Sequence, residues 1–176
     1  GGEKHLLVSS PNEDFIVSIR DLLREKQKTG QTFRLGGHEI KVRYKLIHLN
    51  LNTRFISASP IVLYQDNLQN LYYSFERNKD LNFFLQRLKE NAVKKYNAFY
   101  SEDYELNENI FDRLVFRKET AVQIRKGDAE FIIIGSMWKL LEKFNAHEHG
   151  EFYEFIMDCG LGEKNSLGFG FINPLR

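Results

Sequence analysis

The chain has 176 residues, and its 25 lysines and arginines against 24 aspartates and glutamates give a formal net charge of +1. This length suffices for one domain with a sizeable core or for two small domains. The balanced charge gives no global sign of nucleic-acid binding, so any basic surface must come from local clustering. A single cysteine, Cys159, excludes an intramolecular disulfide framework and a multi-cysteine zinc site, and it favours a reducing compartment.

Targeting and membrane signals are missing from the sequence. It contains no run of about eighteen apolar residues, and its first residues lack the basic and then apolar pattern of a secretion signal. The sequence therefore predicts a cytoplasmic protein without membrane contact.

The first fifty residues predict a strand, a helix and a hairpin. A short apolar run at 4–9 is typical of a strand. Ser10-Pro11 is a helix start, and apolar residues keep helical spacing to about Lys28. The stretch 32–46 turns at Gly36-Gly37 and then alternates, which predicts two antiparallel strands.

A second unit is expected to begin at Leu51. Its predicted elements are, in chain order, a broken strand at 55–64, a short edge strand at 71–75, a helix from Lys79 to about Tyr96, strands at 114–117, 121–125 and 129–135, a helix at 151–158 and a strand at 168–172. This is the β-α-β-β-α-β order of a ferredoxin-like module. The first unit looks like the back half of a similar module. We therefore predict an α+β fold of tandem ferredoxin-like (RRM-like) modules at 1–50 and 51–176, the first of them incomplete.

The segment 160–170 is the most informative in the chain. Its glycines surround a short polar stretch: Gly160, Gly162, Gly168 and Gly170 bracket Lys164, Asn165 and Ser166. Glycine tolerates positive φ and admits a close backbone, so amide N–H groups here are expected to face an anion, naturally a phosphate. The segment lacks the Gly-Lys-Ser/Thr ending of a P-loop. A tight turn whose glycines serve geometry alone is the alternative.

Three stretches carry a family resemblance. Residues 160–170 resemble the C-terminal glycine-rich loop of the RAMP superfamily, and the run Gly-Glu-Lys-Asn-Ser-Leu-Gly-Phe-Gly is similar, nearly residue for residue, to that of the CRISPR repeat-RNA processing endoribonucleases. The stretch 38–42 resembles the strand that closes the family's first module, and 57–61 resembles the strand that opens its second. The resemblance covers essentially this whole chain but only the latter part of a complete family member.

The resemblance implies an endoribonuclease that binds CRISPR repeat transcripts and cleaves within each repeat to give guide RNAs, without a metal or other cofactor. In this family the ribose 2′-hydroxyl attacks the neighbouring phosphate and leaves a 2′,3′-cyclic phosphate. The expected partner is CRISPR repeat RNA, with other CRISPR-associated proteins or a second copy left open. The alternatives are a non-catalytic RAMP subunit that binds RNA in a CRISPR effector complex, and an inactive fragment.

The resemblance assigns no catalytic residue to this chain, because family members usually carry the catalytic histidine upstream of where Gly1 aligns. The histidines present have simpler interpretations. His38 lies in a predicted strand, and His48 lies near the junction of the units. The run His147-Glu148-His149 has the wrong spacing for metal ligands on one helical face and predicts a solvated turn. No metal site is expected.

A predicted hairpin beside the glycine-rich segment carries basic residues that can contact successive phosphates. The predicted RNA-binding residues are Gly160, Gly162, Lys164, Asn165, Ser166, Gly168 and Gly170 in the glycine-rich segment, and Arg117, Lys118, Arg125 and Lys126 on the hairpin. The cations of the helix from Lys79, which include Lys94 and Lys95, are interpreted as its solvent face. Tyr72 and Tyr73 are strand neighbours, so one of them should face outward.

Overall fold

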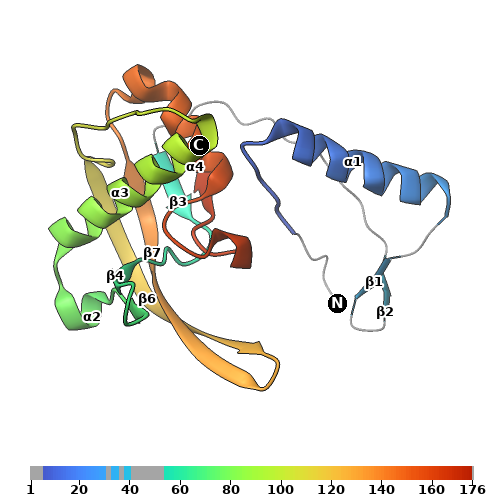
Figure 1. The fold of residues 1–176 in the computed structure, drawn as a ribbon, viewed down its shortest axis with the longest axis horizontal. Coiled ribbons are helices and arrows are strands. Elements are labelled where there is room, and N and C mark those ends of the chain that lie inside the picture. Colours follow the sequence, from blue (N-terminus) through green and yellow to red (C-terminus); the bar gives the residue numbers. More distant parts are fainter. Residues whose placement is uncertain (1–5, 31–32, 36–37, 41–53, 176) are drawn as a thin grey trace. The chain divides into compact units, whose positions relative to one another are not determined.

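The computed structural model describes residues 6–30, 33–35, 38–40 and 54–175 (Figure 1). The chain divides into two compact units, Gly1–Asn50 and Leu51–Arg176. None of the described helices is long and apolar enough to cross a bilayer.

The smaller unit contains one long helix and a short hairpin. Helix α1 (Glu13–Lys28) begins where the Asn12 side chain accepts a hydrogen bond from the amide of Phe15 at 3.1 Å. Strands β1 (Phe33–Leu35) and β2 (His38–Ile40) pair antiparallel, as predicted. The predicted alternation beyond Ile40 lies outside the described residues.

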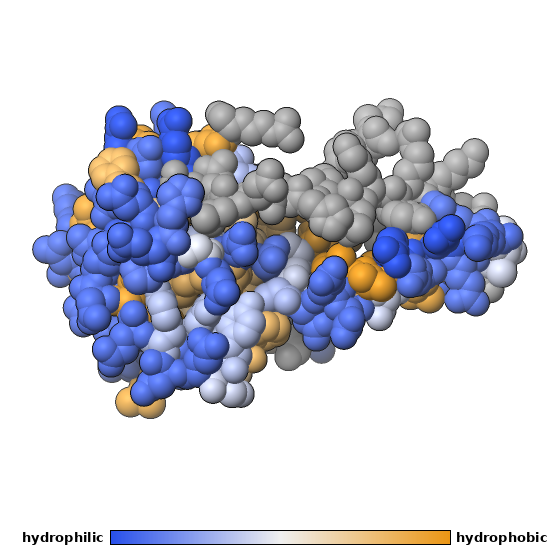
Figure 2. Space-filling model, turned by 90° about the horizontal axis from the view of Figure 1, so that it is seen from above, coloured by the Kyte–Doolittle hydropathy of each residue, from blue (hydrophilic) through white to orange (hydrophobic). Residues whose placement is uncertain are grey.

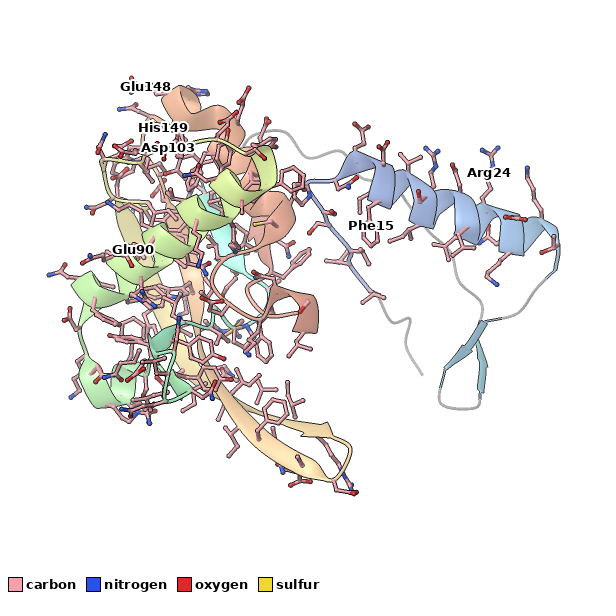
Figure 3. All side chains as sticks on the ribbon, in the orientation of Figure 1. Phe15, Arg24, Glu90, Asp103, Glu148 and His149 are labelled. Carbon is pink, nitrogen blue, oxygen red and sulfur yellow. The ribbon has the colours of Figure 1, made fainter. Side chains whose placement is uncertain are left out.

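The apolar residues of α1 recur on one side of the helix. Within the described part of the chain, none of the residues of α1 is buried, and Phe15 and Arg24 point from opposite sides of the helix in Figure 3. The predicted strand at 4–9 is wrong for its described part, 6–9, which forms no strand. Its apolar side chains are all more than half exposed, so no packing stabilises an extended pairing there.

A four-stranded antiparallel sheet forms the centre of the larger unit. Its strands are β3 (Arg54–Ser57), β6 (Arg113–Lys126), β7 (Ala129–Glu142) and β8 (Ile172–Pro174), in the order β6-β7-β3-β8. Helices α3 (Leu81–Tyr100) and α4 (Gly150–Cys159) complete the order β-α-β-β-α-β that the sequence predicts. The shorter elements are the strands β4 (Tyr64–Asp66) and β5 (Leu71–Tyr72), the helix α2 (Phe75–Asn78), and the 3₁₀ helices η1 (Ala146–His149) and η2 (Asn165–Leu167).

Four predicted strands differ from those in the structure. The two predicted at 114–117 and 121–125 are one strand, because bulges beside Phe116 absorb an irregularity without ending the pairing. The edge strand expected at 71–75 is only β5, and it pairs with β4 in a separate two-stranded sheet. The last strand begins at Ile172 rather than 168, because 168–170 still belong to a turn.

Both helices pack on the sheet through one apolar core. Phe84 and Leu88 of α3, Trp138 of β7 and Phe152 of α4 are almost completely buried in it.

In Figure 2 the visible surface of this unit is mostly hydrophilic, with apolar residues in small separate patches. Such scattered exposure is normal for a folded domain and marks no interface by itself.

Candidate nucleic-acid interface

The glycine loop, residues 160–170, joins α4 to β8. Its first glycine, Gly160, ends α4 with a φ of 81°, and its amide donates to the carbonyl of Ile156 at 3.0 Å. The short helix η2 follows, flanked by Lys164 at a φ of 63° and Gly168 at 84°. A lysine in the left-handed region is uncommon, so its conformation is imposed by the surrounding contacts.

Three of the four glycines make room for the protein's own atoms. A Cβ on Gly162 would overlap the carbonyl oxygen of Val62, and a Cβ on Gly170 would overlap that of Leu161. A Cβ on Gly160 would lie 2.9 Å from the Asn165 amide nitrogen. These glycines are buried, so the geometric interpretation of the loop explains them. RNA contact remains a prediction for the exposed part of the loop.

Gly168 differs from the other three. It is exposed, and a Cβ there would have no described atom within 4 Å. Its neighbours Ser166 and Leu167 are exposed as well. Among the described residues, no hydrogen-bond partner is found for the amides of Lys164, Asn165 and Ser166. Residues 164–168, which we call the loop tip, therefore combine three amides without a hydrogen-bond partner in the described chain with an exposed stretch at 166–168.

The body of the loop is anchored on the segment 59–62. The amide of Glu163 donates to the carbonyl of Val62 at 2.7 Å, and the amide of Gly170 donates to that of Pro60 at 2.8 Å. This segment overlaps the stretch 57–61 singled out in the sequence. Two motifs about a hundred residues apart are thus hydrogen-bonded to each other.

The same segment is bonded to the sheet on its other side. Ile61 exchanges two hydrogen bonds of 2.8 Å with Ser136 of β7. The neighbouring Gly135 is required there, because a Cβ would lie 2.9 Å from the carbonyl oxygen of Ile61 and from the Cβ of Pro60. The segment therefore connects the glycine loop to β7 through main-chain hydrogen bonds.

Lys95 of α3 contacts the loop directly, which corrects its interpretation as a solvent-facing cation. Its ammonium donates to the carbonyl of Gly160 at 2.7 Å, to that of Gly162 at 3.1 Å and to Asn165 Oδ1 at 3.0 Å. Burial lowers the pKa of Lys95 below its ordinary value. The sequence carried a signal for this position, since Lys95 follows the core residue Leu88 by seven residues and so lies on the same helical face.

Lys164, the lysine within the glycine loop, lies over a pair of stacked tyrosines. Lys164 Nζ lies 5.3 Å from the centre of the Tyr64 ring, within the range of a cation–π interaction. Tyr64 in turn stacks on Tyr72, with ring centres 4.9 Å apart. Burial is the main cause that raises the pKa of Tyr72 to about 12, and a hydrogen bond with Tyr64 contributes as well. Tyr73 is buried, whereas Tyr72 is partly buried against Tyr64 and a small apolar cluster, so neither of the two simply faces outward.

The β6–β7 hairpin extends beyond the body of the larger unit (Figure 1). Gly127, with a φ of 61°, lies in the two-residue turn between the paired residues Lys126 and Ala129. The loop residue Phe169 is buried beside Ile133 and packs near Val122, so the glycine loop reaches the base of the hairpin.

The predicted basic residues lie along this hairpin. Arg117, Lys118 and Arg125 are exposed, and Arg125 Nε donates to the carbonyl of Gly127 at 3.2 Å. Arg117 occupies a bulge in the pairing of β6 with β7. The side chain of Lys126 lies outside the described residues. All four basic residues thus lie on β6, and the glycine loop packs against the same hairpin through Phe169.

His149 and the acidic residue Glu108 contact each other within the protein. His149 lies between the Tyr104 hydroxyl, 2.8 Å from its Nδ1, and Glu108, 3.2 Å from its Nε2, while Glu148 is exposed (Figure 3). In the described part of the chain, no three His, Cys, Asp or Glu side chains are close enough to hold a metal ion. The solvated turn predicted at 147–149 lies in a 3₁₀ helix, where His149 contacts Tyr104 and Glu108 of the segment between α3 and β6.

Comparison with known proteins identifies the family. The family model for "CRISPR associated protein Cas6, C-terminal" matches residues 42–174, which include both the segment 59–62 and the whole glycine loop. The chain belongs to the Cas6 family. The family predicted from the three sequence motifs is therefore confirmed.

Two relatives from Methanocaldococcus jannaschii extend this Cas6 assignment. The protein named CRISPR-associated endoribonuclease Cas6 2 is 47% identical over 184 residues, an alignment that covers 100% of this chain and 75% of the relative. The protein named CRISPR-associated endoribonuclease Cas6 1 is 30% identical over 183 residues, covering 97% of this chain and 63% of the relative. This chain therefore spans about two thirds to three quarters of the length of these Cas6 relatives.

Solved structures agree with the Cas6 assignment. A structure described as "CRISPR associated protein Cas6" superposes with a TM-score of 0.63 and 28% identity, covering 96% of this chain and 66% of the other. A structure described as "An RAMP protein binding different RNA substrates" gives a TM-score of 0.57 at 20% identity, covering 96% of this chain and 67% of the other, and supports the fold alone.

Proposed function

We propose that this Cas6-family chain belongs to an endoribonuclease that binds CRISPR repeat transcripts and cleaves them within each repeat to give guide RNAs. The proposal is supported by the 47% identity to a relative named CRISPR-associated endoribonuclease Cas6 2. One structural observation carries it to particular residues: the glycine loop is anchored on both sides, and only its tip is left open to solvent, beside a basic hairpin.

The proposed RNA surface consists of the loop tip and the hairpin. Its cations are Lys164, Arg117, Lys118, Arg125 and Lys126, and its backbone donors are the amides of residues 164–166. Cations fix the register of an RNA backbone, and free N–H groups donate hydrogen bonds to phosphate oxygens. In this proposal Gly160, Gly162 and Gly170 shape the loop, and Gly168 lets the RNA backbone come close.

The proposed reaction needs no metal. The ribose 2′-hydroxyl attacks the adjacent phosphate, the 5′-oxygen leaves, and the product ends in a 2′,3′-cyclic phosphate. Such a reaction requires a base, an acid, and donors for the charge that develops on the phosphorane. The glycine loop has N–H groups and an ammonium suited to positioning the RNA, and we assign it no role as general base.

The fold is proposed to be a tandem of ferredoxin-like modules in a cytoplasmic protein. The second module is supported by the β-α-β-β-α-β order and the strand order of residues 51–176. The first is supported only by the hairpin of β1 and β2 after α1. Other CRISPR-associated proteins or a second copy are further proposed partners.

Cleavage of end-labelled CRISPR repeat RNA in EDTA by the full protein tests the proposal. We expect one cut within each repeat and a 2′,3′-cyclic phosphate on the upstream product. Tight binding without cutting would instead favour the non-catalytic RAMP subunit. A protein that neither binds nor cuts repeat RNA would contradict both functions.

A further inference from the structure

Helix α3 is hydrogen-bonded to the glycine loop through two polar side chains that lie about one turn apart. The Asn91 amide donates to Glu163 Oε1 at 2.8 Å, and Lys95, four residues later, donates to three acceptors of the same loop. Residues four apart share one face of a helix, so the two contacts act together. Both are side-chain contacts from an element distant in sequence.

The Lys95 ammonium is saturated by the loop. An ammonium has three N–H donors, and each of the three meets one acceptor: Gly160 O, Gly162 O and Asn165 Oδ1. A partly desolvated charge is stable only when such partners surround it. Lys95 therefore holds the loop rather than offering a free cation to RNA.

The Asn165 side chain links Lys95 to both ends of the loop by hydrogen bonds. While its Oδ1 accepts from Lys95, its Nδ2 donates to the carbonyl of Leu161 at 3.1 Å and to that of Phe169 at 3.0 Å. The side chain thus bridges the residues on either side of the loop tip. Because its oxygen and both of its N–H donors are used inside the protein, only the backbone of Asn165 is available to RNA.

We propose that Lys95 is a positioning residue for RNA binding: it orients the Asn165 side chain, which ties the two ends of the glycine loop and so sets the conformation of the tip, 164–168. This inference rests on the proposed function of the loop.

The attachment of the loop and the shape of its tip are separable. The main-chain bonds from Glu163 to Val62 and from Gly170 to Pro60 hold the loop on the protein without Lys95. The left-handed conformation of Lys164 and the unpaired amides lie between these two anchors. Loss of Lys95 should therefore disturb RNA contacts at the tip while the surrounding fold persists.

The decisive variant is Lys95→Met, which keeps most of the length of the side chain and removes its donors. The matched control is Lys94→Met, at an exposed lysine one position earlier on α3. Affinity for labelled repeat RNA is measured by fluorescence anisotropy, below the onset of thermal unfolding of each variant. We expect Lys95→Met to weaken binding about tenfold or more, the equivalent of one charge-assisted hydrogen bond, and Lys94→Met to change it much less.

A double-mutant cycle distinguishes positioning from direct contact or plain stability. Lys164→Ala is introduced into the wild type and into Lys95→Met, and the salt dependence of RNA affinity is measured for all four proteins. If Lys95 acts through the tip, Lys164→Ala has a smaller effect in the Lys95→Met background. Additive effects would overturn the proposal, because they would mean that Lys95 does not act through Lys164.

A second variant protects the test against misfolding. Asn165→Asp keeps the shape of the side chain and an acceptor for Lys95, but it removes the two donations to Leu161 and Phe169. We expect it to weaken RNA binding as well. Equal affinity of wild type and of folded Lys95→Met or Asn165→Asp would refute the inference. Failure of the wild type to bind repeat RNA would instead refute the proposed function.

Discussion

Glycines of one loop serve different purposes in this protein. Gly162 lies against the backbone of Val62, whereas Gly168 faces open space, although both have a positive φ. Their spacing in the sequence does not distinguish them, because the neighbours that press on Gly162 come from a segment a hundred residues away. Only the exposed glycine is positioned to admit another molecule.

The two glycines should therefore respond differently to replacement by alanine. Gly168→Ala places a side chain in a left-handed conformation without a clash, and we expect a loss of about 1 kcal/mol in the free energy of unfolding. Gly162→Ala adds overlap with main-chain atoms to the same strain, and we expect a loss of about 3 kcal/mol or more. Urea denaturation measures both. Equal losses would contradict the packing described for Gly162.

Lys164 is the cation that we expect to meet RNA at the tip. Replacing Lys164 by alanine should lower the slope of log affinity against log salt by about one, because one phosphate contact is lost. Titration of repeat RNA at several salt concentrations measures this slope, with the exposed Lys94→Ala as the control. An unchanged slope would leave Lys164 as a surface cation that packs on Tyr64.

At the C-terminal end of β7, a buried lysine bonds to the segment between α3 and β6. Lys143 is 2% exposed and reaches Glu108 at 2.7 Å, Asp112 at 3.2 Å and the carbonyl of Asn109 at 3.1 Å. Lys143 follows β7 directly, and its three partners belong to the segment between α3 and β6. This network, with His149, holds the mostly exposed segment between α3 and β6 against the end of β7.

We expect Lys143→Met to lower the free energy of unfolding by about 1 to 2 kcal/mol, because the buried hydrogen bonds of the ammonium are lost while water still screens its partly exposed carboxylate partners. The exposed lysine Lys139 on β7 provides the control, and Lys139→Met should change stability by about 0.5 kcal/mol or less. Chemical denaturation of both variants measures the difference. Similar stability of the two variants would mean that the network contributes little.

The stability of the whole fold should fall at alkaline pH because of its packed tyrosines. Burial raises the pKa of Tyr104 to about 12, and burial with the contact to Tyr64 raises that of Tyr72 to about 12. Above the ordinary tyrosine pKa of about 10, the unfolded chain releases these protons first, so it binds fewer protons than the folded protein and stability decreases. We expect stability to fall between about pH 10 and 12.

Spectrophotometric titration of tyrosinate, combined with denaturation at each pH, tests this expectation. The variants Tyr72→Phe and Tyr104→Phe should each reduce the alkaline loss of stability. An alkaline loss of stability in both variants that is as large as in the wild type would exclude these two tyrosines as its source.

The larger unit holds the complete described core. All buried apolar residues found in the described part of the chain lie between Phe55 and Ile172, and none lies in α1. We expect residues 51–176 alone to unfold cooperatively, at a midpoint close to that of the larger unit within the whole chain. Calorimetry of both polypeptides measures this. A fragment without a cooperative transition would show that the smaller unit is required for the fold.

Local patterns in the sequence were enough for the main helices, the order of elements in the second unit and the family. Helix caps, apolar spacing and turn glycines act over a few residues, so they can be recognised without the fold. The glycine loop was recognised in the same way, from its own residues.

Contacts between distant segments could not be obtained in this way. The anchoring of the loop on 59–62, the burial of Lys95 and the single long strand β6 depend on neighbours that lie tens of residues away along the chain. A lysine on a helix has the same local pattern whether water or three loop acceptors surround its ammonium. Folding decides between these environments, because only the tertiary structure brings the acceptors to the lysine and removes the water.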